Sequence, residues 1–328
     1  MDGNAFERVD EPLGSLTIAQ EMNEPPSGVV VSLGALGNRP ENQPTHGFDS
    51  TGKTGLFDLG QINVHFEEEL SCLWAFITPE DRPNYNMGLL RDTMRWQDEA
   101  KRHFSARPEA LKFMVLGSRF PGIFNLGGDL NMFADCIERQ DRATLRHYGH
   151  LCVEIVEKVW HSNHMPVISI GLAQGDALGG GFEALLCFDV IVAERQARFG
   201  LPEILFGLFP GMGAYSILSR RIGHAQTEKM LLSGKVFSAE EMFEMGLVTV
   251  LAETGEGEQA VRDYIAQAAP RHAGTVGIFQ AGRRVNPMTL EELRDIVDGW
   301  VDAALRLSAA DLRMMRRLAR AQLRLGAH

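Results

Sequence analysis

The middle of the chain alternates between short apolar runs and longer amphipathic segments. Runs with the length and composition of strands lie at residues 62–68, 72–77, 111–117, 166–173 and 190–193. We expect the first two strands to pair with each other. A charged helix is predicted over 87–104, and one or two amphipathic helices are predicted over 131–162. Strands that alternate with helices favour an α/β fold with largely parallel pairing.

Beyond residue 213 the hydrophobic pattern becomes mainly helical. Segments with an apolar face lie near 214–222, 224–233, 238–245, 257–269, 289–307 and 309–324, and a strand-like run lies at 247–251. Ser238 and Ser308 stand just before two of these segments, where a hydroxyl can accept a hydrogen bond from a free helix N–H. The last segment is rich in arginine. Most such faces are solvated or paired, but this one could also bind an acidic carrier protein.

The N-terminal part of the chain has a different composition. Residues 1 to about 60 are rich in Gly, Pro, Asn, Asp and Thr, and they predict a partly flexible arm with one short strand at 29–33. The pattern GxxxxGK[ST] at 47–54 is typical of a phosphate-binding loop, but the strand and helix that such a loop needs do not flank it. The predicted organisation is therefore an N-terminal arm over 1–61, a core over 62–255 and a C-terminal helical region over 256–328.

Composition argues against several classes of protein. The 328 residues are 45% hydrophobic and 23% charged, which is typical of a globular protein. A formal charge of −11 argues against nucleic acid as the main partner. We find no secretory signal pattern and no apolar stretch long enough to span a membrane. Four widely spaced cysteines without a CxxC pair indicate packed thiols and a cytoplasmic protein.

The densest chemical signal follows the strand predicted at 166–173. Three consecutive glycines, Gly179–Gly181, precede a predicted helix with Glu183 in its first turn. The free N–H of Gly180, at the positive end of that helix, could stabilise an oxygen that becomes negative during a reaction. Glu203 follows further along the chain and can return to the same pocket. Two carboxylates beside such a donor suit proton transfer next to a carbonyl group.

Simpler interpretations stand beside this one. Three glycines often form nothing more than a tight turn, and a first-turn glutamate stabilises a helix without doing chemistry. A second strand, glycine loop and helix is predicted around Gly127, with Asp129 as the helix cap. Glycoside hydrolases also pair carboxylates, but they usually need an aromatic platform, and aromatic residues make up 8% of this chain. No metal site is predicted, because the spacing typical of metal ligands is not found among His147, His150, His161 and His164.

Three blocks of sequence resemble the crotonase (enoyl-CoA hydratase/isomerase) superfamily. They are FNLGGDL at 124–130, QGDALGGGFE at 174–183 and FGLPEILFGLFPGMGA at 199–214. Within this superfamily the chain is most similar to the diffusible signal factor synthases, bacterial enzymes that make cis-2-unsaturated fatty acids for cell–cell signalling. The resemblance implies a spiral of ββα units with C-terminal helices that assemble trimers or hexamers, and it implies no cofactor.

The resemblance also implies roles for particular residues. The N–H groups of Gly128 and Gly180 would hold a thioester oxygen, and Glu183 and Glu203 would act as acid and base. The candidates for contact with the acyl chain are Leu126, Gly127, Leu201, Leu205, Phe209 and Met212. Apolar residues of this kind more often form part of the core. The implied reaction is dehydration of a 3-hydroxyacyl chain on acyl carrier protein, followed by hydrolysis to a free cis-2-unsaturated acid.

One departure from the family pattern bears on the substrate. Coenzyme A users of this family often have a lysine two residues after the aspartate of the first loop, where this chain has Asn131. The change favours a carrier-protein thioester over a coenzyme A ester. Two alternatives stay open: a generic enoyl-CoA hydratase or isomerase that acts on coenzyme A esters, and a non-catalytic fatty-acyl-binding member that would need neither glutamate.

Overall fold

The computed structural model describes residues 56–79 and 82–325, with side chains described up to residue 321. The strand expected at 29–33 and the phosphate-loop pattern at 47–54 lie outside the described residues. The division into an arm, a core and a C-terminal region stays a prediction. In the described part of the chain, no helix is both long enough and apolar enough to cross a membrane.

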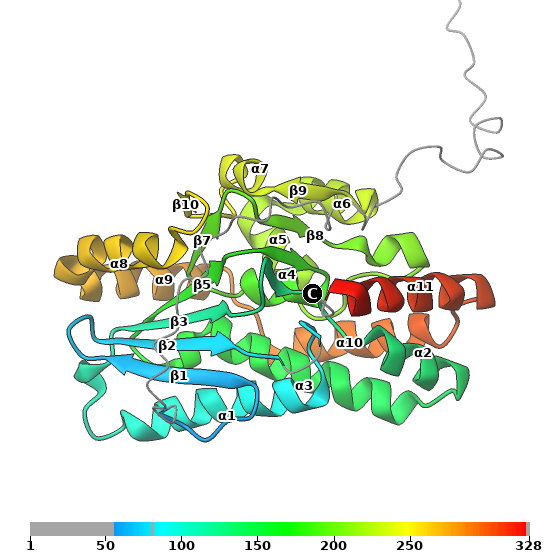
Figure 1. The fold of residues 1–328 in the computed structure, drawn as a ribbon, viewed down its shortest axis with the longest axis horizontal. Coiled ribbons are helices and arrows are strands. Elements are labelled where there is room, and N and C mark those ends of the chain that lie inside the picture. The colour runs from blue at the N-terminus through cyan, green and yellow to red at the C-terminus, as the bar shows by residue number, and fades with distance from the viewer. Residues whose placement is uncertain (1–55, 80–81, 326–328) are drawn as a thin grey trace, which may run out of the picture. The chain divides into compact units, whose positions relative to one another are not determined.

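A six-stranded sheet with the order β1-β2-β3-β5-β7-β10 forms the centre of the described fold (Figure 1). Its strands are β1 (Ile62–Glu67), β2 (Cys72–Ile77), β3 (Phe113–Ser118), β5 (Ile168–Ala173), β7 (Val190–Glu194) and β10 (Val250–Ala252). β1 pairs antiparallel with β2, and each later pair of neighbours is parallel. The α/β fold, the pairing of the first two strands and the largely parallel sheet are therefore confirmed.

A second sheet of four strands, with the order β4-β6-β8-β9, was not expected from the sequence. Its strands are β4 (Ile123–Asn125), β6 (Asp176–Leu178), β8 (Arg198–Gly200) and β9 (Val236–Ser238). Each strand has only three residues, which is too short for a hydrophobic period to be recognised. The parallel pairing of β4 with β6 matters for function, because both glycine loops leave from these two strands.

The helices agree with most of the sequence predictions. They are α1 (Met87–His103), α2 (Leu130–Glu138), α3 (Arg142–Trp160), α4 (Gly180–Leu185), α5 (Ala214–Ile222), α6 (His224–Ser233), α7 (Ala239–Glu244), α8 (Gly257–Ala268), α9 (His272–Val285), α10 (Leu290–Ala304) and α11 (Ala309–Leu325), with a 3₁₀ helix η4 (Pro202–Phe206). α9 was missed, because glycines at 274, 277 and 282 weaken its helix propensity. Asp129 and Ser238 cap α2 and α7 as predicted.

Alternate residues of the large sheet face two separate layers of helices. On β2, Trp74 packs in the cluster that contains Val261 of α8 and Val276 of α9. The neighbouring Leu73 packs on the other face, in the larger cluster that contains Leu89 of α1. Burial of one such side chain contributes about 1.5–3 kcal/mol, so the two layers fix the sheet firmly. The sheet thereby provides a rigid base for the loops at its edge.

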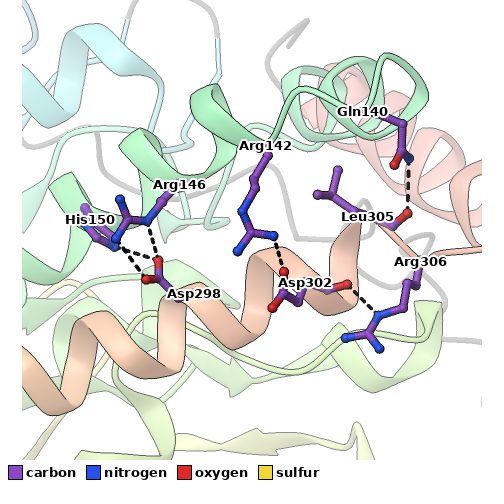
Figure 2. Close-up of polar contacts among 8 residues, drawn as sticks. All are labelled: Gln140, Arg142, Arg146, His150, Asp298, Asp302, Leu305 and Arg306. Atoms are coloured by element: carbon purple, nitrogen blue, oxygen red, sulfur yellow. Dashed lines mark hydrogen bonds and ion pairs between the residues drawn. The ribbon is translucent and has the colours of Figure 1, made fainter.

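α10 is attached to α3 by a row of polar contacts, which Figure 2 shows. Arg146 donates two hydrogen bonds to Asp298, at 2.7 and 3.0 Å, and His150 lies 2.9 Å from the same carboxylate. Arg142 pairs with Asp302 one turn further along α10. The hydrogen bond from Arg146 is the main cause that lowers the pKa of Asp298 to about 2. We call this row of contacts the α3–α10 seam.

Candidate active site

The first glycine loop connects β4 to α2. Gly127 has a φ of +89°, a conformation that favours glycine, and its N–H donates to Asn125 Oδ1 at 2.8 Å. The next residue, Gly128, is followed by Asp129, whose carboxylate accepts hydrogen bonds from the N–H groups of the first turn of α2. The backbone turn and the helix cap thus hold Gly128 between a buried strand and a helix.

The second glycine loop connects β6 to α4 and touches the first loop. A Cβ atom on Gly181 would lie 2.0 Å from the carbonyl oxygen of Asn125, and one on Gly127 would lie 2.7 Å from the nitrogen of Gly180. A Cβ atom on Gly180 would lie 3.6 Å from the nitrogen of Gly128. The backbones therefore approach so closely that side chains are excluded.

The N–H groups of Gly128 and Gly180 lie at this contact between the loops. Within residues 56–79 and 82–325, no hydrogen bond is recorded from either group. Gly180 is also the first residue of α4, where helix N–H groups lack an internal acceptor. The two donors predicted from the sequence are thus brought together, and both have capacity to bind an oxygen.

Glu183 lies in the first turn of α4 with only 2% of its surface exposed. Its Oε1 accepts hydrogen bonds from the N–H groups of Met212, at 2.9 Å, and Ala214, at 3.1 Å. Burial raises the pKa of this carboxyl above its ordinary value, and the two backbone donors oppose that effect. The donors come from the turn that leads into α5, so that turn fixes the orientation of the carboxyl group.

Glu203 lies on η4 and reaches back to the second glycine loop. Its Oε1 is 2.8 Å from the position that a Cβ atom on Gly179 would occupy. Its Oε2 is buried and, among the described residues, has no hydrogen-bond partner. Burial, and then the negative charge of Glu183, raise the pKa of Glu203 above its ordinary value. Glu203 thus lies against the second glycine loop and close enough to Glu183 for their charges to interact, and the roles of the two glutamates as acid and base stay a prediction.

The apolar candidates for acyl contact divide into two groups. Leu126, Leu201 and Met212 are buried in the main hydrophobic cluster. Leu205 and Phe209 each expose 38% of their surface. Leu205 lies beside α6, because a Cβ atom on Gly234 would be 2.9 Å from its Cδ2. The contact of these side chains with substrate stays a prediction.

Sequence reasoning missed the residues that support the first glycine loop from behind. The hydroxyl of Tyr148, on α3, donates to the carbonyl oxygen of Tyr85 at 2.7 Å, and the N–H of Tyr85 donates to the carbonyl of Gly127 at 2.7 Å. A Cβ atom on Gly128 would lie only 2.5 Å from the ring of Phe133. No local motif distinguishes these aromatic residues from ordinary core positions in the sequence.

The described residues contain no group of three or more His, Cys, Asp or Glu side chains that could hold a metal ion. The four histidines mentioned above do not gather at the glutamate pair. His150 lies against Asp298 in the α3–α10 seam, and His161 stacks on His164 with a centroid distance of 5.3 Å. The candidate site is therefore built from backbone N–H groups and carboxyl groups.

Comparison with known families decides the classification. The profile of the family described as enoyl-CoA hydratase/isomerase matches residues 101–276, which include both glycine loops and both glutamates. The chain belongs to the enoyl-CoA hydratase/isomerase family. This confirms the crotonase resemblance inferred from the three sequence blocks.

Individual members of the hydratase/isomerase family differ in how much of their length this chain matches. It is 30% identical over 171 residues to the fatty acid oxidation complex subunit alpha of Idiomarina loihiensis, which covers 52% of this chain but only 23% of that protein. It is 28% identical over 197 residues to the crotonyl-CoA hydratase of Syntrophomonas wolfei, covering 60% of this chain and 70% of the relative. The chain thus spans about a quarter of the first relative.

The fold of this hydratase/isomerase family member is also found in solved structures. DspI from Pseudomonas aeruginosa matches with a TM-score of 0.62 and 25% sequence identity, over 73% of this chain and 93% of DspI. An enoyl-CoA hydratase from Bacillus halodurans matches with a TM-score of 0.65 and 22% identity, over 78% of this chain and 99% of that one, which confirms the crotonase-type α/β fold.

Proposed function

We propose that the protein dehydrates 3-hydroxyacyl groups carried as thioesters on acyl carrier protein and then hydrolyses the cis-2-enoyl thioester to a free cis-2-unsaturated acid. The observation that carries this proposal is the close approach of the Gly128 and Gly180 loops, with Glu203 against Gly179 and near enough to Glu183 for the charge of Glu183 to raise its pKa. Family membership supports acyl thioesters as the class of substrate. The resemblance of FNLGGDL at 124–130, LPEILFGLFPGMGAYS at 201–216 and the C-terminal WVDAAL at 300–305 to diffusible signal factor synthases supports the particular product.

The two glycine N–H groups would bind the thioester carbonyl oxygen. When a proton leaves C2, negative charge moves onto this oxygen, and donors already in place stabilise it. Loss of one such donor typically costs about 2.7–4 kcal/mol of transition-state stabilisation. The donors here come from rigid backbone, so the protein spends little energy on reorganising them during the reaction.

The two glutamates would exchange one proton with the substrate. One carboxylate removes a proton from C2, the other carboxylic acid delivers a proton to the C3 hydroxyl, the C3–O bond breaks, and water leaves as the C2–C3 double bond forms. The free site favours a single shared proton on Glu203, because its Oε2 lacks a partner whereas Glu183 Oε1 accepts two hydrogen bonds. Hydrolysis would follow at the same oxyanion site, with water adding to the carbonyl carbon and the thiol leaving.

The choice of carrier protein over coenzyme A is supported by Asn131. It lies in the first turn of α2, at the position where coenzyme A users often have a lysine. A neutral amide lacks the charge that would attract the phosphates of coenzyme A. We propose coenzyme A esters as weaker substrates, and trimers or hexamers as the assembled form.

Mass spectrometry of the acids released from a panel of 3-hydroxyacyl carrier proteins tests the proposal. We expect the wild-type protein to release cis-2-enoic acids, and we expect Glu183→Gln and Glu203→Gln to release almost none while remaining folded. The same acyl chain on coenzyme A provides the comparison. Full turnover by both variants would remove the acid–base assignment, and a clear preference for coenzyme A would favour a generic hydratase.

A further inference from the structure

The surface of α11 differs in charge from the protein as a whole. The helix carries five arginines and one aspartate, whereas the full chain has a formal charge of −11. Arg313, Arg317 and Arg320 are exposed, and they follow one another at intervals of four and three residues. Residues at these intervals lie on one side of a helix, so the three guanidinium groups form a single stripe.

The opposite side of α11 is used for packing. Met315 and Ala319 are buried, with 0% and 2% of their surface exposed. Arg316 extends sideways and pairs with Asp135 and Glu138 of α2 at 2.8 Å. Among the described residues, Arg313, Arg317 and Arg320 have no ion-pair partner recorded. The three arginines of the stripe are therefore exposed, and no ion pair among the described residues neutralises their charge.

α11 contacts α2 and η4, and Figure 1 shows its red ribbon beside α2. α2 begins directly after Gly128 and Asp129, the first glycine loop. At η4, a Cβ atom on Gly207 would lie 3.2 Å from both Leu307 and Asp311, at the start of α11. The helix that carries the basic stripe thus packs against the segments that position Gly128 and Glu203.

We propose that the exposed stripe of Arg313, Arg317 and Arg320 is the docking surface for the acidic acyl carrier protein that delivers the thioester. Charge complementarity guides the association of proteins and fixes their register, and carboxylates on an acidic helix would face the three guanidinium groups. Met314, which is 40% exposed next to the stripe, supplies an apolar contact. This inference rests on the proposed function, because it names the surface that holds the carrier of the same substrate.

Fluorescence anisotropy with a labelled bacterial type II acyl carrier protein measures the docking without any turnover. The test variant is the triple substitution R313E, R317E and R320E. The matched control is R91E, K101E and R107E, which changes the net charge equally at three exposed positions on and after α1. We expect the test variant to weaken carrier binding at least about tenfold and the control to change it less than about twofold. Wild-type binding should weaken with added NaCl.

Kinetics with two thioesters of one acyl chain separate this inference from the proposed function. The thioesters are the acyl carrier protein and the small N-acetylcysteamine ester. The ratio of their kcat/KM values should fall at least about tenfold in the test variant and stay within about twofold in the control. If the wild-type protein turns over neither ester, the proposed function fails, and the anisotropy result still decides the docking surface.

Four results would overturn the docking surface. One is the absence of wild-type binding to the carrier protein, and another is equal weakening in the test and control variants. The third is that light scattering shows the wild-type assembly dissociating in the test variant alone, since the stripe would then join copies of this chain. Selective loss of binding to phosphatidylglycerol vesicles, with carrier binding retained, would likewise assign the stripe to a lipid surface.

Discussion

The paired glycine loops and the α3–α10 seam hold distant parts of the chain together by opposite means. At the loops, backbone touches backbone, and a Cβ atom on Gly181 would come within 2.0 Å of a carbonyl oxygen. At the seam, long side chains such as Arg146 reach across to half-exposed carboxylates such as Asp298. The site therefore depends on close backbone approach, whereas the seam depends on contacts that solvent partly replaces.

The largest combined effect on stability and activity should follow from Gly181→Ala. The new methyl group would collide with Asn125 and separate the two loops, which should cost about 1–3 kcal/mol of stability. A displacement of about 1 Å at the oxyanion donors should lower kcat/KM about a hundredfold or more. The matched control is Gly299→Ala on α10, where no atom lies within 4 Å of the new Cβ. Unchanged kinetics in Gly181→Ala would show that the close approach is not required.

Glu203→Gln should separate activity from stability. Loss of the acid–base group should lower kcat about 10²–10⁴-fold. The raised pKa means that the folded state binds this proton more tightly than the unfolded state, so wild-type stability falls as pH rises above the ordinary glutamate value of about 4.3. The neutral glutamine removes this loss, so the variant should gain stability over the wild type as pH increases.

Urea unfolding between pH 5 and pH 9 measures the stability effect, and Glu244→Gln, at an exposed position on α7, is the control. A difference in the free energy of unfolding between Glu203→Gln and the wild type that widens with pH supports a raised pKa of Glu203. If the gap instead narrows with rising pH, Glu203 is stabilised as an anion and the shared-proton description is wrong.

Tyr148→Phe should have a moderate effect, because it weakens the support of the first loop and leaves the reacting groups in place. The variant loses the hydrogen bond to the carbonyl of Tyr85, worth about 1 kcal/mol. We expect kcat to fall about fivefold, with the pH profile unchanged because neither glutamate is touched. Tyr264→Phe on α8 provides the comparison. A shift in the pH profile of Tyr148→Phe would instead indicate that the hydroxyl takes part in proton transfer.

The smallest effect should follow from Asp298→Asn in the seam. The pair with Arg146 is partly exposed, so its loss should cost less than about 1 kcal/mol at pH 7. Because the pKa of Asp298 is lowered to about 2, its contribution is present above the unfolded value near 3.9 and disappears as pH falls towards 2. Thermal unfolding at pH 7 and pH 3 should show the difference shrinking. A cost of several kcal/mol at pH 7 would place the seam among the essential contacts.

Long elements were predicted well from the sequence because their periodicity repeats over many residues. Examples are α1, the two strands β1 and β2, and the helices after residue 213 other than α9. α9 was missed, since its glycines lower helix propensity and only Val276 is buried, so packing rather than sequence decides its helix. The three-residue strands of the second sheet were missed because they contain less than two periods of alternation.

Gly180, Glu183 and Glu203 could be named from the sequence, since a glycine run and isolated carboxylates stand out in an apolar segment, and Gly128 followed from the family resemblance. Their surroundings could not be predicted. The N–H groups of Met212 and Ala214 that hold Glu183 belong to a turn whose position depends on the tertiary fold. Tyr148 is 63 residues away from its acceptor, Tyr85, and nothing in either local sequence indicates that contact.

Exchange of the C2 hydrogen in D₂O tests whether the contact between the two glycine loops forms the active site. A saturated acyl thioester without a C3 hydroxyl can be deprotonated at C2 but has no group to eliminate, so deuterium uptake reports the oxyanion loops and the base alone. We expect the wild-type protein to catalyse uptake at C2 and Gly181→Ala to abolish it. Uptake by wild type no faster than in buffer, or undiminished uptake by Gly181→Ala, would contradict an active site built on the contact between the two loops.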